Sequence, residues 1–338
     1  MNMPAICLDG AAQAVRRLDR RWLLALYAVV PLSIGVIVAD ILVFGRYLQR
    51  AILPATPEQW PIWAVVFGLP HVIAGLLTMA DREYLGFYRR RCIAPLLLFG
   101  TVSLGAAVGP APFLFAVSIW LGLYTVTHLL SQQIGLSYSM LRTPSSRQMR
   151  IWKVLIMAIG LILYVALYLD VSMPNATLGH FDPHALCVLV CVPLLAALAV
   201  STAALARGAV DRCGRYYIWS NAGMMLGVYL AYLLRYPVFI LLIPRVVHDL
   251  TAYLVYLNHD TNRNATTRHN VLYLLQSRRQ RPARWILPAV SIALGFGLQM
   301  NDYPPVIAAN FFLTFMHYHI ESFIWRRPNP HRSFLELS

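Results

Sequence analysis

The stretch from Pro237 to Arg263 constrains the fold of this chain more than any other. It is long enough to cross a bilayer as a helix, because about 20 mostly apolar residues span about 30 Å of hydrocarbon. At about 100° per residue, its polar side chains lie within about 120° of one another, and apolar side chains take the opposite side. The polar face consists of Arg245, His248, Asp249, Ala252, Tyr256, His259 and Asp260, and the apolar face of Val247, Leu250, Leu254 and Leu257. Ionisable groups inside a membrane nearly always face a protein interior or a wet cavity, so this face predicts a functional site.

The rest of the chain is strongly apolar, with 59% hydrophobic residues and a mean hydropathy of +0.59. Its apolar residues come in runs of about 20, which are separated by short arginine-rich patches. This pattern predicts an all-α fold, namely a polytopic helical bundle embedded in a membrane. We expect about ten transmembrane helices, at residues 22–45, 61–80, 92–108, 111–140, 151–172, 184–206, 216–234, 237–259, 284–300 and 304–325.

The positive charge follows the same plan. Of the 28 basic residues, 24 lie in alternate connections and in the two tails, which the positive-inside rule assigns to the cytoplasm. We therefore expect a cytoplasmic tail at 1–21, a single transmembrane domain at 22–325 and a second cytoplasmic tail at 326–338. The net charge of +14 reports this topology and does not indicate a nucleic-acid partner. The arrangement is typical of a bacterial inner-membrane protein, and the oligomeric state stays open.

The five cysteines show no CxxC pair and no spacing that suggests disulfides. Cys187 and Cys191 share a helix face, four residues apart, and we interpret them as packing residues.

Apart from His184, which we assign to the external loop at the start of its span, six of the ten histidines lie in the even-numbered predicted spans, all of which run in the same direction. Measured from the cytoplasmic end of each span, one histidine in each of four spans lies roughly 12 to 18 Å deep. These four are His71, His128, His248 and His317. Four predicted helices therefore present an imidazole at a similar level, which indicates a shared metal site.

Carboxylates complete the ligand set. Glu321 lies four residues after His317 on one helix face, and Asp249 follows His248. We predict that Asp249 and Glu321 act as catalytic carboxylates. His259 is a further candidate ligand, although eleven residues separate its backbone from that of His248 by about 16 Å, which makes a second site or a cytoplasmic mouth more plausible. His319 points away from His317 and is expected to bond a neighbouring helix.

The ligand type sets the chemistry. Neutral imidazoles with a carboxylate suit a transition metal, most favourably iron, with zinc and copper as alternatives. An iron site with open positions would activate dioxygen, and a zinc site would hydrolyse. Because this site would lie in the hydrocarbon layer, its partners would be membrane lipids and a hydrophobic small molecule that enters from the lipid.

Two other classes of function stay open. In a transporter or channel, Arg245, Asp249, Asp260 and the histidines would relay protons or coordinate a permeating ion. In a structural subunit, the same polar groups would bond neighbouring helices. Broken helices are typical of transporters, and the only candidate breaks in the eighth predicted span are Pro237 and Pro244.

The run FGLPH, which ends in His71, resembles the Brp/Blh family of membrane β-carotene dioxygenases, and His128 follows 57 residues later. The resemblance implies a multispanning iron enzyme that cleaves a carotenoid centrally with dioxygen, and it implies His71 and His128 as iron ligands. The sequence departs from the family pattern at Val72, directly after His71, and at Ala252, four residues after His248.

Overall fold

The computed structural model describes residues 16–54, 59, 68–142, 147–172, 182–265, 269–274, 283–299, 303–326 and 328–338. These residues form helices, turns and three isolated bridges, and no extended strand occurs among them. The predicted all-α fold is confirmed for this part of the chain. Residues 1–15 of the predicted N-terminal tail, most of the external loop 173–183 and parts of the basic loop 263–284 lie outside the described residues.

The chain divides into two compact units, and each is described by itself. Unit 1 comprises Met1–Asp19, Ala64–Gly122 and Thr251–Ser338. Its own helices are α4 (Leu69–Thr78), α5 (Arg82–Val108), α11 (Val271–Leu274), α12 (Ala283–Gln299), α13 (Pro304–Ile324) and α14 (Pro330–Ser333).

Unit 2 comprises Arg20–Trp63 and Leu123–Leu250. It contains α1 (Arg20–Ala25), the 3-10 turn η1 (Leu26–Ala28), α2 (Val29–Leu42), the π-helical turn η2 (Leu48–Ile52), α7 (Arg147–Ser172), α8 (Pro183–Ala206) and α9 (Arg212–Leu233). Two helices, α6 (Ala111–Tyr138) and α10 (Pro237–Arg263), contribute residues to both units.

Each of the ten predicted spans contains a helix of the structure. By length and composition, six described segments suffice to cross a membrane: Arg20–Leu42, Arg82–Val108, Ala111–Tyr138, Arg147–Asp170, Pro183–Ala206 and Pro237–Arg263. Helices α4 and α12 are apolar but shorter. These long apolar helices are typical of a membrane protein, whereas the number of ten spans and the cytoplasmic termini stay predictions.

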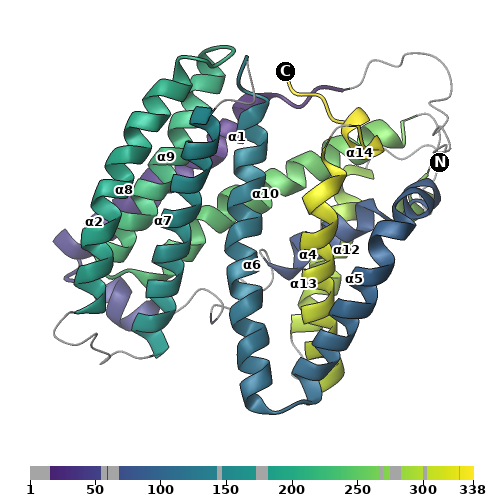
Figure 1. The fold of residues 1–338 in the computed structure, drawn as a ribbon, viewed down its shortest axis with the longest axis horizontal. Coiled ribbons are helices and arrows are strands. Elements are labelled where there is room, and N and C mark those ends of the chain that lie inside the picture. The colour runs from purple at the N-terminus through teal and green to yellow at the C-terminus, as the bar shows by residue number, and fades with distance from the viewer. Residues whose placement is uncertain are drawn as a thin grey trace. The chain divides into compact units, whose positions relative to one another are not determined.

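In unit 1, α13 packs against α5 and α4, and α12 packs against α4 (Figure 1). The rings of Phe99 on α5 and Phe315 on α13 stack with centroids 5.1 Å apart. A glycine brings α12 close to α4, because a Cβ at Gly295 would lie 2.7 Å from Pro70 Cγ. The first turns of α4 therefore sit against both α12 and α13.

In unit 2, α7 packs against α8, and α9 packs against α8, α2 and α7 (Figure 1). Several polar side chains inside this bundle are paired, and Trp152 Nε1 donates to Thr202 Oγ1 at 2.9 Å. Gln133 Oε1 accepts from the hydroxyls of Tyr27 at 3.2 Å and Tyr217 at 2.9 Å. Such pairing is needed because an unpaired buried polar group is costly.

Aspartates begin several helices. The Asp81 side chain accepts from the amides of Glu83 and Tyr84 at the start of α5. At the start of α9, Asp211 Oδ1 accepts from the Gly214 amide at 2.7 Å, and Oδ2 pairs with Arg20 at 2.7 Å. The Gly214 hydrogen bond, followed by the charge of Arg20, lowers the pKa of Asp211. These N-caps satisfy amides that have no partner within the helix.

Candidate metal centre

The structure brings the four core histidines together as two pairs, one in each unit. His71 on α4 and His317 on α13 form the pair of unit 1, and both are fully buried. His128 on α6 and His248 on α10 form the pair of unit 2, and both are buried. Each pair joins two helices that are distant in sequence.

The start of α4 fixes the orientation of His71. Gly68, with a positive φ of 76°, precedes the helix, and Pro70 stands in its first turn. The Gly68 carbonyl lies 2.7 Å from His71 Nδ1. Because a carbonyl only accepts, Nδ1 carries the proton, and Nε2 keeps its lone pair as neutral imidazole.

His317 meets that lone pair from α13. The Nε2 atoms of His71 and His317 lie 3.1 Å apart, and the rings are perpendicular with centroids 4.8 Å apart. Glu321, one turn later on α13, places Oε2 3.6 Å from His317 Nε2. Unit 1 therefore gathers two imidazoles and one carboxylate in a buried position, as the i,i+4 spacing predicts.

Gly75 on α4 makes this approach feasible. A Cβ at this position would lie 2.6 Å from two atoms of the His317 ring and 2.9 Å from the Tyr256 hydroxyl. Such distances are below normal van der Waals contact, so a side chain here would displace the imidazole.

Glu321 is itself held by two donors. The Tyr256 hydroxyl, from the part of α10 in unit 1, donates to Oε1 at 2.5 Å, and Trp325 Nε1 donates to the same oxygen at 3.0 Å. Both donors engage Oε1 and leave Oε2 directed toward His317. Partners of this kind orient a ligand and tune its basicity.

The pair of unit 2 has a different environment. The rings of His128 and His248 meet edge to face, with centroids 5.1 Å apart. Asp249 is fully buried, and its Oδ2 lies 3.5 Å from Arg245 Nε, one turn earlier on α10. Its Oδ1 lies 3.9 Å from His248 Nε2. Arg245 thus compensates the charge of Asp249, as required of a buried carboxylate.

No protein-family model, curated protein or solved structure matches this chain in the comparisons. The chemistry of the site is therefore argued from its own residues.

The donor set of unit 1 indicates which metal it would suit. Two histidines and one carboxylate form the ligand set typical of non-haem iron(II) oxygenases, in which further coordination positions stay open. Two nitrogens bound at right angles to one ion, each at about 2.0–2.1 Å, lie about 3 Å apart. The observed 3.1 Å between the Nε2 atoms fits this arrangement.

His259 has another environment. Its Nδ1 lies 2.8 Å from Asp260 Oδ1, and its Nε2 lies 3.0 Å from the Tyr84 hydroxyl. Both ring nitrogens therefore have hydrogen-bond partners, and its ring stacks on His331 with centroids 4.8 Å apart. We leave His259 out of the ligand set on this ground.

His319 lies away from the proposed ligands and contacts another helix. As predicted, it bonds a neighbouring helix, because its Nε2 lies 3.1 Å from the Arg91 carbonyl of α5. Cys187 and Cys191 are free and buried, in accord with a packing role.

A third ligand-type group lies near the start of α5. Asp81, Glu83 and His269 each bring one such atom to within 4.8 Å of the others. Arg263 already bonds Asp81 at 2.9 Å and Glu83 at 2.6 Å, so this group is an ion-pair network.

The sequence alone did not indicate the contacts of two buried residues, Tyr256 and His331. Tyr256 shares the predicted polar face of α10, but its partner Glu321 is 65 residues away, so only the tertiary pairing reveals their bond. His331 belongs to a charged tail and carries no signal of burial, yet it is fully buried between Tyr84 and His259.

Proposed function

We propose that this chain is a membrane-embedded, metal-dependent oxidoreductase of the non-haem iron oxygenase type. The single observation that carries the proposal is the convergence of His71, His317 and Glu321 in unit 1. The two Nε2 atoms are 3.1 Å apart, and the carboxylate is 3.6 Å from the nearer one. The proposed ligands are these three side chains, and iron is the metal that this set favours.

The surrounding residues support ligand roles. The Gly68 carbonyl holds His71 in the tautomer whose Nε2 keeps its lone pair as a ligand atom. Tyr256 and Trp325 hold Glu321 by Oε1, and Oε2 lies 3.6 Å from His317 Nε2. When bound, iron(II) with open positions supplies the activation of dioxygen.

The substrate is proposed to be a hydrophobic isoprenoid or another lipid. The long apolar helices of this chain favour a substrate that enters from the lipid phase. The resemblance of the FGLPH run to the β-carotene dioxygenases makes a carotenoid the first probe.

A transporter receives less support. Many transporters bind their cargo at broken helices near the midplane. Here α10 begins at Pro237 and continues through Pro244 to Arg263 without interruption. Its half-buried Arg245 and buried Asp249 pair with each other, which is a structural use of both charges.

We further propose the topology that the charge distribution favours, with ten spans, both termini in the cytoplasm and a location in a bacterial inner membrane. Accessibility labelling at Gly109 tests it, because this residue follows α5 and is expected on the external side. A cytoplasmic signal at Gly109 would contradict this topology.

Dioxygen uptake tests the function directly. Full-length protein in vesicles is loaded with iron(II) or with zinc(II) and mixed with β-carotene, squalene or an unsaturated phospholipid as probes. We expect uptake with iron and at least one probe, none with zinc, and none in Glu321→Gln. Absence of uptake with every probe in iron-loaded protein would contradict the proposal.

A further inference from the structure

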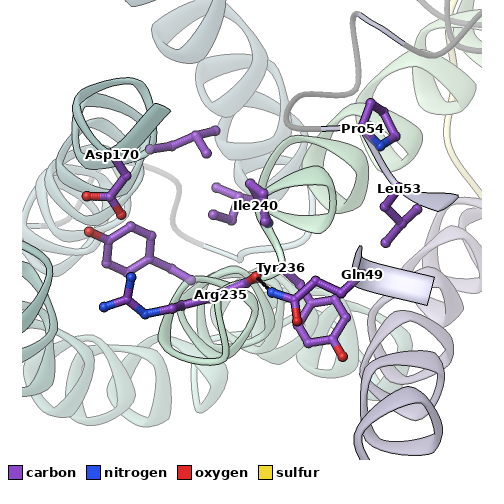
Figure 2. A pocket seen from close by; sticks show the side chains of 10 residues that line it. Gln49, Leu53, Pro54, Asp170, Arg235, Tyr236 and Ile240 are labelled. Atoms are coloured by element: carbon purple, nitrogen blue, oxygen red, sulfur yellow. Dashed lines mark hydrogen bonds between the residues drawn. The ribbon is translucent and has the colours of Figure 1, made fainter. Parts of the chain in front are cut away.

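Unit 2 contains a cavity of about 270 Å³ beside the turn that joins α9 to α10 (Figure 2). It lies where η2, the end of α7 and the start of α10 meet, and it is distinct from the proposed ligands of unit 1. The lining residues belong to unit 2 alone. Asp170, Tyr232 and Arg235 supply polar groups to the lining, and Leu53, Leu167 and Ile240 supply apolar ones.

Polar contacts hold η2 against the turn. Asp40 accepts from the amides of Leu48 and Gln49 at 2.8 and 3.0 Å and from the Tyr236 hydroxyl at 2.8 Å. The Gln49 side chain in turn donates to the Arg235 carbonyl, as Figure 2 shows. These bonds fix one wall of the cavity.

The backbone of this wall is strained. Arg46 and Arg235 are the two non-glycine residues with positive φ in the described chain, at 66° and 61°. Arg46 Nη1 donates to the Leu234 carbonyl at 3.2 Å, so the two strained turns are bonded to each other. Backbone strain of this kind persists only where surrounding contacts enforce it, and it is concentrated at ligand sites.

Two opposite charges line the cavity without neutralising each other. Asp170 and Arg235 both lie on one side of it in Figure 2. The Asp170 carboxylate is 3.5 Å from His184 Nδ1, and the Arg235 guanidinium forms no ion pair or hydrogen bond with a described residue. The cavity therefore offers an anion site and a cation site together.

Tyr232 adds a third polar group. The residue is 2% exposed, and its hydroxyl makes no hydrogen bond of good geometry with a described residue, although Asp170 and Cys187 lie nearby. A buried hydroxyl without a partner is costly, so a ligand atom that bonds it would restore a normal environment.

Exposed apolar side chains, which we call the apolar rim, stand in the chain a few residues before η2, whose Gln49 lines the cavity. Leu42, Val43 and Phe44 are 77%, 72% and 62% exposed, at the end of α2 just before η2. Within the cavity, Leu53, Leu167 and Ile240 supply further apolar surface. Hydrocarbon chains would cover such surfaces, whereas a small water-soluble zwitterion would leave the rim exposed.

We propose that this cavity binds the headgroup of a zwitterionic lipid with a primary ammonium, of the phosphoethanolamine class. Arg235 binds the phosphate, Asp170 accepts from the ammonium, and the Tyr232 hydroxyl donates to a phosphate oxygen. The acyl chains lie along the apolar rim. An ammonium with N–H donors is required, because Asp170 only accepts hydrogen bonds.

Lipid binding to the full-length protein in detergent tests this site, with native mass spectrometry as the readout. The probes are dioctanoyl phosphatidylethanolamine, the phosphatidylcholine and phosphatidylglycerol analogues, and free O-phosphoethanolamine. Phosphatidylethanolamine should bind about 10-fold tighter than either analogue, because only it engages both charged residues by hydrogen bonds. Equal binding of all three lipids would overturn the proposal, and free O-phosphoethanolamine binding as tightly as the lipid would overturn the lipid assignment.

Variants sharpen the test. Asp170→Asn and Arg235→Gln should each weaken phosphatidylethanolamine binding about 10-fold, and the matched control Arg50→Gln, on η2 outside the lining, should leave it unchanged. Tyr232→Phe should weaken binding about 3- to 10-fold while the melting temperature stays equal or rises, because the empty protein loses an unpartnered hydroxyl. Undiminished binding in both charge variants contradicts the site.

Discussion

His71 Nε2 and His317 Nε2 lie 3.1 Å apart although 246 residues separate them in the chain. Both imidazoles are fully buried, and the Gly68 carbonyl fixes the proton of His71 on the other nitrogen. With Glu321 beside them, they form the set of donors on which the proposed function rests.

Tyr256→Phe should weaken metal affinity without unfolding the protein. The Tyr256 hydroxyl donates to Glu321 Oε1 at 2.5 Å, so its removal leaves the carboxylate less well oriented. Loss of such an orienting partner typically costs about 10- to 100-fold in affinity. Tyr253→Phe on the same helix is the control, since that hydroxyl lies 3.2 Å from Ser291 Oγ. Equal affinities of the two variants for iron(II) would remove Tyr256 from the site.

Gly75→Ala should disrupt the site and destabilise unit 1. The added Cβ would lie 2.6 Å from the His317 ring, and overpacking of this kind costs about 1–3 kcal/mol. Gly86→Ala on α5 is the matched control, because nothing lies within 4 Å of its Cβ. There we expect a stabilisation of about 0.5–1 kcal/mol, since glycine is less favourable than alanine in a helix. Chemical denaturation of both variants measures the difference.

The pH dependence of stability should reflect His331. Burial first, and then the charges of His259 and Arg263, hold its pKa well below the usual 6.5, so the folded protein keeps this ring neutral. The groups around it are Tyr84, Tyr88, His259, Trp325 and Arg263.

The sign follows from linkage. Below about pH 6.5 the unfolded chain binds a proton at His331 that the folded chain does not, so this contribution to stability is complete above that pH and falls as the pH is lowered. The slope is at most about 1.4 kcal/mol per pH unit. His331→Gln should lose this part of the dependence in unfolding measured from pH 8 to pH 5. An unchanged slope would show that His331 does not titrate as described.

Metal stoichiometry tests the sequence prediction that all four core histidines bind one ion. The proposed ligands of unit 1 predict one ion per chain, lost in His71→Ala and retained in His128→Ala, whereas one ion shared by all four histidines would be lost in both variants. Two ions, with one retained in each variant, would assign separate sites to the two pairs.

Much of the fold could be predicted from the sequence, because runs of apolar residues in a membrane leave the helix as the simplest way to pair the backbone. The His317–Glu321 arrangement was predictable for a local reason, since residues four apart share a helix face. The Tyr256–Glu321 bond was not, because it depends on how α10 and α13 pack. His331 also escaped, since a polar tail gives no periodic signal when its last residues fold back, as the bridge between Leu18 and Leu337 shows.

The most direct test of the account is the metal content of protein purified in detergent without chelator. We predict stoichiometric transition metal, most favourably iron, in the wild-type chain. His71→Ala and His317→Ala should lose most of it while still inserting in the membrane, and His319→Ala should retain it, because that ring bonds the Arg91 carbonyl. Wild-type protein without stoichiometric metal, or full metal content in both His71→Ala and His317→Ala, would contradict the proposed oxygenase.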